Sequence, residues 1–224
     1  MSTRVPALLI CTLAAASCRT GSGSSAVPAS GAGAGSIPPI VQPGAPGQSS
    51  RIIAADKATD LSHVEFTGAD VRFMQGMIGH HEQAVEMVAL VPSRTNRADM
   101  KKLALRIDVS QADEIKMMQH WLEVRHQEVP GPHAMHMHGA TLMPGMLTAE
   151  EMTRLGDAKG DEFDRLFLEG MIKHHGGALT MVKDLFDTTG AGQDVEIFSF
   201  ASDVDADQRM EIDRMGSMLR EIQK

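Results

Sequence analysis

Cysteine is almost absent from this chain of 224 residues, and the two that occur, Cys11 and Cys18, lie close to the N-terminus. The rest of the chain can therefore form no disulfide and offers no thiolate to a metal ion. A site that required soft sulfur ligands beyond this first segment would have to use methionine instead.

Aromatic residues and clustered positive charge are also scarce. The chain has seven Phe, one Trp and no Tyr, its formal net charge at pH 7 is −8, and Lys and Arg form no cluster. Such a chain is not expected to bind nucleic acid or an anionic membrane surface. It also lacks a G-x-S-x-G motif and a phosphate-binding loop, so we do not expect an enzyme of the hydrolase or ATPase kind.

Methionine and histidine are the residues that the chain has in excess. Of its 17 Met, all but the first lie between Met74 and Met218, and all ten His lie between His63 and His175. Thioethers and imidazoles thus share one region. Together they suit Cu(I) and, by softness, Ag(I), whereas carboxylate-rich sets suit harder ions.

The N-terminus, "MSTRVPALLICTLAAASCRT", has an early Arg, a short apolar run and then small residues. This pattern predicts a secretory signal peptide over residues 1–18, with an apolar run too short to span a membrane. Cys18 follows Ala-Ala-Ser and resembles a bacterial lipoprotein cleavage site, although Ala15 stands where Leu is usual. We expect export, either to the periplasm or to a lipid anchor on the bacterial envelope through Cys18.

Residues 19–58 are mostly Gly, Ser, Ala and Pro and lack the apolar content needed to fold. We interpret them as a disordered linker, which would tether a folded domain to the envelope. Low-complexity filler without that role is the alternative.

Helical periodicity begins after the linker and continues to the C-terminus. It predicts long helices over about 67–92, 96–128, 161–186 and 194–222, a short helix opened by the capping box at Thr148–Glu151, and no strand of useful length. Four long helices with two short connections predict an all-α, antiparallel four-helix bundle over residues 59–224. A Met/His loop over 129–147 would join its halves.

The helical part of the sequence contains an internal repeat. "FMQGMIGHHEQAVEMV" at Phe73–Val88 returns as "FLEGMIKHHGGALTMV" at Phe167–Val182, and the Gln-x-x-Glu-Ile-x-x-Met pattern at Gln111–Met118 returns at Gln208–Met215. The repeated unit is therefore a helical hairpin. Two tandem αα-hairpins related by a pseudo-two-fold axis would bring the equivalent motifs face to face.

Helical geometry separates the two histidines of each pair by about 100°. One of them can face the bundle axis while the other faces an adjacent groove. Met77 lies three residues before His80 and four before His81, within side-chain reach of either, and Met171 has the same relation to the second pair. Met87 and Met181 lie further along the same faces of the two helices as Met77 and Met171. The candidate metal residues on the helices are Met77, His80, His81, Met87, Met171, His174, His175 and Met181. The loop adds His133, Met135, His136, Met137, His138, Met143 and Met146.

Asp70 and Asp164 stand at equivalent positions near the starts of the two histidine-bearing helices. They are either charges favoured by the helix dipole or acceptors that fix a histidine tautomer behind the metal ligands. The methionines also have an ordinary explanation, because Met fills irregular gaps in helical cores.

The doubled motif "D-x-x-F-x-x-G-M-I-x-H-H", at Asp70–His81 and Asp164–His175, resembles the bacterial family known as domain of unknown function 305. The resemblance covers about residues 60–224 and implies a ferritin-like helical fold. It also implies an exported copper-binding protein linked to copper and silver tolerance, with metal residues Met77, His80, His81, Met171, His174 and His175. One departure is "HHEQA" in the first copy against "HHGGA" in the second, so the two halves need not bind equally.

We therefore predict sequestration or delivery of copper, as Cu(I), with Ag(I) or Cu(II) as further candidates. Binding through imidazole should weaken below about pH 6.5. One rival is a metal-free helical envelope or interaction module with a Met-rich core. The other is a di-iron oxidoreductase, which needs repeated Glu-x-x-His pairs; the single pair at Glu123–His126 has Arg220 and Gln223 as its counterparts.

Overall fold

The computed structural model describes residues 40–42, 49–54, 65–131 and 142–223. Within them lie the strands β1 (Ile40–Gln42) and β2 (Arg51–Ile53) and the helices α2 (Gly68–Arg94), α3 (Ala98–Val124), α4 (Ala149–Asp157), α5 (Gly160–Asp187) and α6 (Val195–Ile222). The predicted helical class is confirmed. The antiparallel pair β1–β2, with Ile40 opposite Ile53, was not predicted and falls within the expected linker. None of the described helices combines the length and apolarity that a bilayer span requires.

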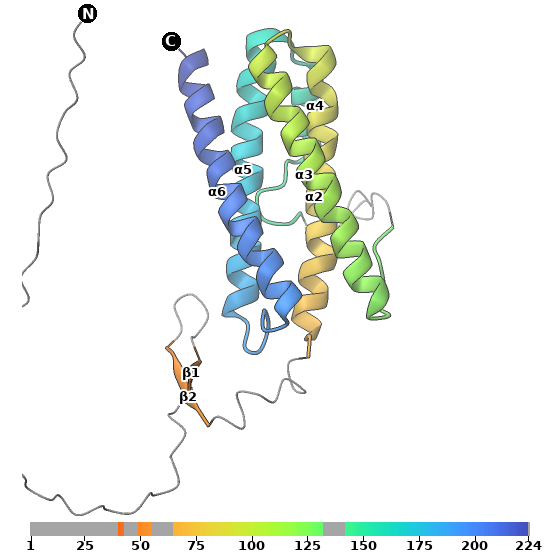
Figure 1. The fold of residues 1–224 in the computed structure, drawn as a ribbon. Coiled ribbons are helices and arrows are strands. Elements are labelled where there is room, and N and C mark those ends of the chain that lie inside the picture. The colour runs from red at the N-terminus through yellow and green to blue at the C-terminus, as the bar shows by residue number, and fades with distance from the viewer. Residues whose placement is uncertain (1–39, 43–48, 55–64, 132–141, 224) are drawn as a thin grey trace, which may run out of the picture. The chain divides into compact units, whose positions relative to one another are not determined.

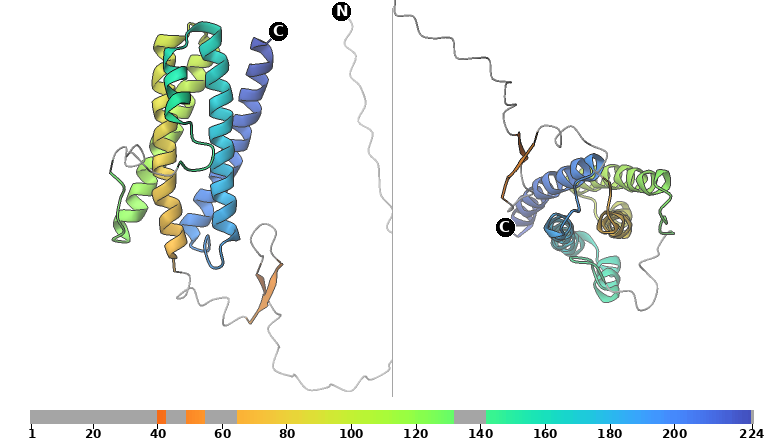
Figure 2. Two further views of the ribbon diagram at one scale, coloured as in Figure 1. Left: turned by 180° about the vertical axis from the view of Figure 1, so that it is seen from behind. Right: turned by 90° about the horizontal axis from the view of Figure 1, so that it is seen from below.

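Two helical hairpins make up the helical body (Figure 1). α2 packs antiparallel to α3, α5 packs antiparallel to α6, and the hairpins meet chiefly along α2 and α5. Figure 2 shows α3 and α6 on one side of the α2–α5 pair and α4 on the other. The packing shows two helical hairpins, while their origin as a repeat and the ferritin-like classification stay predictions.

The ends of the first hairpin's helices follow from local side-chain chemistry. Thr67 forms a capping box with Asp70: its hydroxyl accepts the Asp70 amide, and the Asp70 carboxylate accepts the Thr67 amide at 2.6 Å. α3 ends at Val124, earlier than predicted, because His126 has a left-handed φ of 54° and the Gln127 amide turns back to the Leu122 carbonyl. α2 also runs on to Arg94, two residues beyond the predicted end at Pro92.

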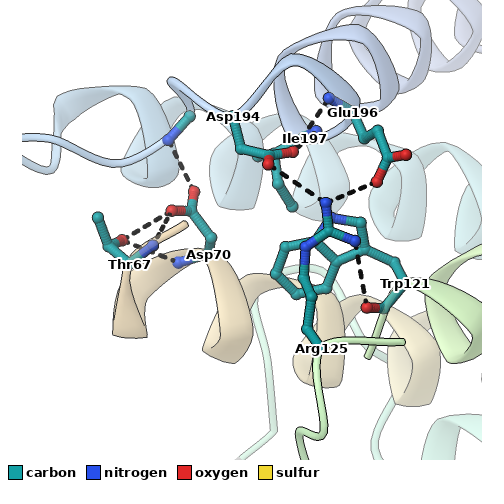
Figure 3. Close-up of polar contacts among 8 residues, drawn as sticks. Thr67, Asp70, Trp121, Arg125, Asp194, Glu196 and Ile197 are labelled. Atoms are coloured by element: carbon teal, nitrogen blue, oxygen red, sulfur yellow. Dashed lines mark hydrogen bonds and ion pairs between the residues drawn. The ribbon is translucent and has the colours of Figure 1, made fainter. Parts of the chain in front are cut away.

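A cationic clamp closes the end of the body where α3 stops and α6 starts (Figure 3). The Arg125 guanidinium lies 4.4 Å from the centroid of the Trp121 ring and pairs with Asp194 at 3.3 Å and with Glu196 at 2.7 Å. Stacking on the indole and charged hydrogen bonds both favour arginine at this position. The clamp ties the first hairpin to the second.

The interior divides into two apolar clusters separated by a polar layer. One cluster contains Met171, Phe167 and the C-terminal half of α2; the other contains Met77, Trp121 and the C-terminal half of α5. Between them, at the middle of all four long helices, lie the buried or partly buried polar side chains of His80, His81, Gln111, Glu114, His174, His175, Gln208 and Glu211. Burying so many polar groups is unfavourable unless they are partnered. These eight side chains, here called the histidine layer, are therefore the candidate functional site.

Candidate metal centre

The first histidines of the two repeated motifs meet at the centre of the layer. The ring centroids of His80 on α2 and His174 on α5 are 3.8 Å apart, with ring planes inclined by 36°. Both side chains are fully buried. The equivalent motifs therefore meet at this point, as the sequence predicted.

The second histidines turn away from each other, toward the other helix of their own hairpins. His81 Nε2 lies 2.6 Å from Glu114 Oε2 on α3, and His175 Nε2 lies 2.7 Å from Glu211 Oε2 on α6. The predicted divergence of the two histidines in each pair is confirmed, and its cause is the 100° step between adjacent helical residues.

The hydrogen-bond partners define which ring nitrogen of each neutral imidazole carries the proton. Carboxylate and carbonyl oxygens accept, so Nε2–H donates in His81, in His175 and in His80, whose Nε2 lies 3.0 Å from the Pro144 carbonyl oxygen. In the neutral form of each ring the lone pair would lie on Nδ1. All three Nδ1 atoms are buried without a hydrogen-bond partner, as is Nε2 of His174. One layer thus holds four buried imidazole nitrogens without a partner.

Burial sets the charge of these groups. It lowers the pKa of His80 to about 3, helped by the neighbouring His81 and opposed by the Pro144 carbonyl. Burial, together with His80, also lowers the pKa of His174 well below its ordinary value. For Glu114, burial alone would raise the pKa, but hydrogen bonds from His81 and Ser110 outweigh it and lower the pKa. At neutral pH the central imidazoles are therefore uncharged and the Glu114 carboxylate is ionised.

Methionine side chains lie in the two apolar clusters that flank the histidine layer and at the contact between α2 and α5. Met77 and Met171 are fully buried, one in each apolar cluster. Met181 of α5 lies over Gly76 of α2, where a Cβ would be 3.5 Å from its methyl carbon. Met87 of α2 is placed in the same way over Gly170 of α5, at 3.3 Å. Each helix thus has a glycine that leaves room for a thioether of the other hairpin.

Part of the predicted Met/His loop also reaches the layer. The Met143 sulfur would lie 3.1 Å from a Cβ at Gly76, Met146 is buried, and the Pro144 carbonyl accepts from His80. The remaining predicted loop residues, His133, Met135, His136, Met137 and His138, lie outside the described residues.

For Asp70 and Asp164 the sequence left open a role as helix N-terminal charges and a role as acceptors for histidine; their described hydrogen bonds are to the ends of helices and to turns, not to histidine. Asp70 accepts from the Thr67 cap and from the Gly192 amide, and Asp164 accepts from the Thr95 hydroxyl at 3.1 Å. Each carboxylate thus binds the turn of the opposite hairpin. Both precede the first histidine of their helix by ten residues, a rise of about 15 Å.

The carboxylates that do contact imidazoles are Glu114 and Glu211. Sequence reasoning found them in the repeated Gln-x-x-Glu pattern without assigning them a role. The available signal was their equivalent placement on the partner helix of each histidine pair.

The donor set limits the kind of ion that the layer could hold. Within the part of the chain that the structure describes, no group of three or more His, Cys, Asp or Glu side chains is arranged around one point. The His80 and His174 rings lie against each other with their planes inclined by 36°. An ion bound here would therefore depend on thioether sulfur, on rotated imidazoles, or on both. Di-iron sites use four carboxylates. The histidine layer has two, Glu114 and Glu211, and each is hydrogen-bonded to a histidine. The layer therefore does not have the ligand set of a di-iron site.

Fold and site together define a class: a helical protein of two equivalent hairpins that bury a shared layer of histidine between methionines. The chain belongs to the DUF305 family, described as "Domain of unknown function (DUF305)", whose family model matches residues 70–219. No curated protein matches the chain.

Several solved structures are similar. A DUF305 protein of Streptomyces coelicolor, described as a "putative secreted protein", is 32% identical with a TM-score of 0.57, and the match covers 69% of this chain and 93% of that one. A DUF305 fragment from Deinococcus radiodurans is 29% identical with a TM-score of 0.58, covering 70% and 98%. CopM in its Cu(II)-bound form is 28% identical with a TM-score of 0.56, covering 68% and 96%. CopM structures with Cu(I) and with Ag bound match as well.

Proposed function

We propose that this protein binds copper or silver ions in the histidine layer, with Cu(I) and Ag(I) preferred over Cu(II), and that it sequesters or delivers them. The observation that carries the proposal is the set of four buried imidazole nitrogens without a partner. A buried acceptor that lacks a hydrogen bond is costly. Coordination to a metal would use those lone pairs.

The neighbouring groups favour a soft ion. Neutral imidazole and thioether together suit Cu(I) and Ag(I), and the methionines that flank the layer, Met77, Met171 and Met143, would supply the sulfur. Glu114 and Glu211 would orient His81 and His175, as carboxylates behind metal-bound histidines commonly do. The similarity to CopM, which has been solved with Cu(I), Cu(II) and Ag bound, supports the same choice.

We also propose that the protein acts outside the cytoplasm. The predicted signal peptide over residues 1–18 and the description of the Streptomyces coelicolor relative support export. A lipid tether through Cys18 would hold the protein at the envelope; incorporation of a labelled fatty acid, lost in Cys18→Ser, would test it.

The test of metal binding is a Cu(I) competition titration against a chromogenic chelator. The full chain is used with Cys11→Ser and Cys18→Ser in every variant, because thiolates would bind Cu(I) themselves. The reference protein should compete for Cu(I), and the double variant His80→Ala, His174→Ala should bind at least about tenfold more weakly, since it removes both central imidazoles.

The matched control is His120→Ala combined with His126→Asn, which removes two exposed histidines, one on α3 and one in the turn after it; asparagine tolerates the left-handed φ of His126. It should bind as the reference does, and circular dichroism should show unchanged helicity in all three proteins. Equal affinity of the two double variants would contradict the proposed location of the site.

A metal-free helical module is the second candidate, and a specific observation favours it. The pairs His81–Glu114 and His175–Glu211 already satisfy part of the layer by hydrogen bonds, as in a structural polar core. Failure of the reference protein to compete for Cu(I) or Ag(I) would make this candidate the better account.

A further inference from the structure

The segment Met143–Leu147, here called the strap, lies across α2 and α5. It leads into α4, and Figure 2 shows this part of the chain on the side of the α2–α5 pair opposite α3 and α6. Its Pro144 carbonyl accepts from His80 at 3.0 Å, and the Met143 sulfur lies beside Gly76. The strap therefore covers one side of the histidine layer.

On α5 the strap is seated by direct contact between backbones. A Cβ at Gly177 would lie 1.8 Å from the Pro144 carbonyl oxygen, and a Cβ at Gly145, where φ is +76°, would lie 2.5 Å from the Lys173 carbonyl oxygen. No side chain fits at either position while the strap is in place. The close approach therefore requires glycine on both sides of the contact.

On α2, besides the hydrogen bond from His80, the strap is held by Gln83, which makes two hydrogen bonds. The Leu147 amide donates to Gln83 Oε1 at 2.7 Å, and Gln83 Nε2 donates to the Leu147 carbonyl at 3.0 Å. Gln83 is only 2% exposed. This pair satisfies both backbone groups of Leu147, which would otherwise be buried without partners.

The two seating residues occupy the same place in the repeat. Gln83 is the second residue after the His80–His81 pair, and Gly177 is the second residue after His174–His175. The departure between "HHEQA" and "HHGGA" thus has a physical reason. There is one strap and there are two helices, so one helix supplies the hydrogen bonds and the other supplies the space.

We propose that Gln83 and Gly177 are positioning residues that seat the strap over the histidine layer, and that release of the strap is the step by which the metal ion enters and leaves. This inference rests on the proposed function. His80 and His174 are at most 1% exposed, so an ion can reach them only if a covering element moves. The strap is five residues long and held by few hydrogen bonds, whereas the other covers among the described residues are helices of 27 or 28 residues.

The experiment compares Gly177→Ala with Gly176→Ala in the full chain carrying Cys11→Ser and Cys18→Ser. Both replacements add one methyl group to α5, but a Cβ at Gly176 meets nothing within 4 Å. Each protein is loaded with Cu(I), and transfer to excess chromogenic chelator is followed by stopped flow. Hydrogen exchange of the Leu147 amide is measured in the metal-free proteins.

Gly177→Ala should release Cu(I) about tenfold faster or more than Gly176→Ala and should lose protection of the Leu147 amide, since displacement of the strap breaks its hydrogen bonds. Gln83→Leu, which removes the two hydrogen bonds and keeps α5 intact, should change both measurements in the same direction. Agreement of the two variants excludes a local defect of one helix as the cause.

The outcomes separate this inference from the proposed function. If the reference protein binds Cu(I) but Gly177→Ala and Gly176→Ala release it at the same rate, the control of exchange by the strap is overturned and the metal site stands. If the Leu147 amide stays equally protected in both, the seating role of Gly177 is overturned. If the reference protein binds no Cu(I), the proposed function fails, and the inference fails with it.

Discussion

The two hairpins share the residues that build the histidine layer and differ in those that receive the strap. In both, a first histidine meets its counterpart across the α2–α5 interface and a second histidine bonds a glutamate of the partner helix. The symmetry ends at Pro144, which bonds His80, while Nε2 of His174 has no hydrogen-bond partner. The repeated motif accounts for the histidine layer. The strap, which occurs once, accounts for the difference between Gln83 and Gly177.

The glutamates show a second difference between the hairpins. Glu114 accepts from Ser110 at 2.9 Å and keeps 20% of its side chain exposed, whereas Glu211 lies 3.5 Å from Arg106 and keeps 7%. The second carboxylate is therefore more buried and has a charged partner. Equivalent substitutions in the two hairpins should reveal which features are truly shared.

The largest expected effect is a shared one. Met77→Ala and Met171→Ala should each lower the free energy of unfolding by about 2–5 kcal/mol, because each leaves a cavity at a fully buried position. Urea denaturation of the metal-free proteins measures this. A cost of less than about 1 kcal/mol at either position would show that the two methionines are not packed equivalently.

Leucine variants separate the packing role of these methionines from metal binding. Met77→Leu and Met171→Leu conserve apolar volume and should cost less than about 1.5 kcal/mol. They also remove the thioether, so Cu(I) affinity should fall in both. An unchanged affinity in both variants would limit these two residues to packing.

The glutamates should respond unequally. Glu211→Ala should cost about 3 kcal/mol, because it leaves His175 buried without an acceptor and removes the partner of Arg106. Glu114→Ala should cost about 1–2 kcal/mol at its more exposed position. Thermal and urea unfolding of both variants test the order, with Glu→Gln at each site as the isosteric control. A larger cost at Glu114 would refute it.

The sequence was sufficient to predict the features that arise from local periodicity. The apolar repeat and the caps located the four long helices to within a few residues, and the doubled motif predicted that the equivalent segments of the two hairpins would meet. The helical step predicted that the two histidines of a pair would point in different directions, but it did not identify His80 and His174 as the pair that meets. All of these depend on residues close together in the chain or on the repeat itself.

The remaining features depend on contacts between distant segments, which periodicity does not encode. Glu114 meets His81 only because α3 folds back on α2. The sequence could not decide whether Asp164 is a helix N-terminal charge or an acceptor for histidine, and the antiparallel hairpins place it beside Thr95. Gln83 and Gly177 were recognised as a departure from the repeat, yet their role required the position of Pro144.

The stability of the metal-free protein should fall in acid through His80. Burial lowers its pKa from 6.5, the ordinary value of histidine, to about 3, so the unfolded chain binds more protons between these values. Stability is then complete above pH 6.5 and declines as pH falls toward 3, by about 2 kcal/mol at pH 5. Urea denaturation at pH 7 and pH 5 measures the loss.

His80→Gln is the matched variant for this pH dependence. It should lose less stability between pH 7 and pH 5 than the reference, and an identical loss would contradict the lowered pKa.

The burial of His80 also revises the expectation that metal binding weakens below pH 6.5. A histidine with a pKa of about 3 stays neutral well below that value.

The smallest expected effect concerns Gly176, the neighbour of Gly177 in the motif "HHGGA". Gly176→Ala should raise the free energy of unfolding by about 0.5–1 kcal/mol, because alanine restricts the unfolded chain and a Cβ here meets nothing. Gly177→Ala should gain less or lose stability, since the same benefit is offset by displacement of the Pro144 carbonyl. Urea denaturation of the two variants side by side measures the difference. Equal gains would mean that the strap contributes nothing to stability at Gly177, whereas unequal gains would assign the requirement for glycine in the second hairpin to that one residue.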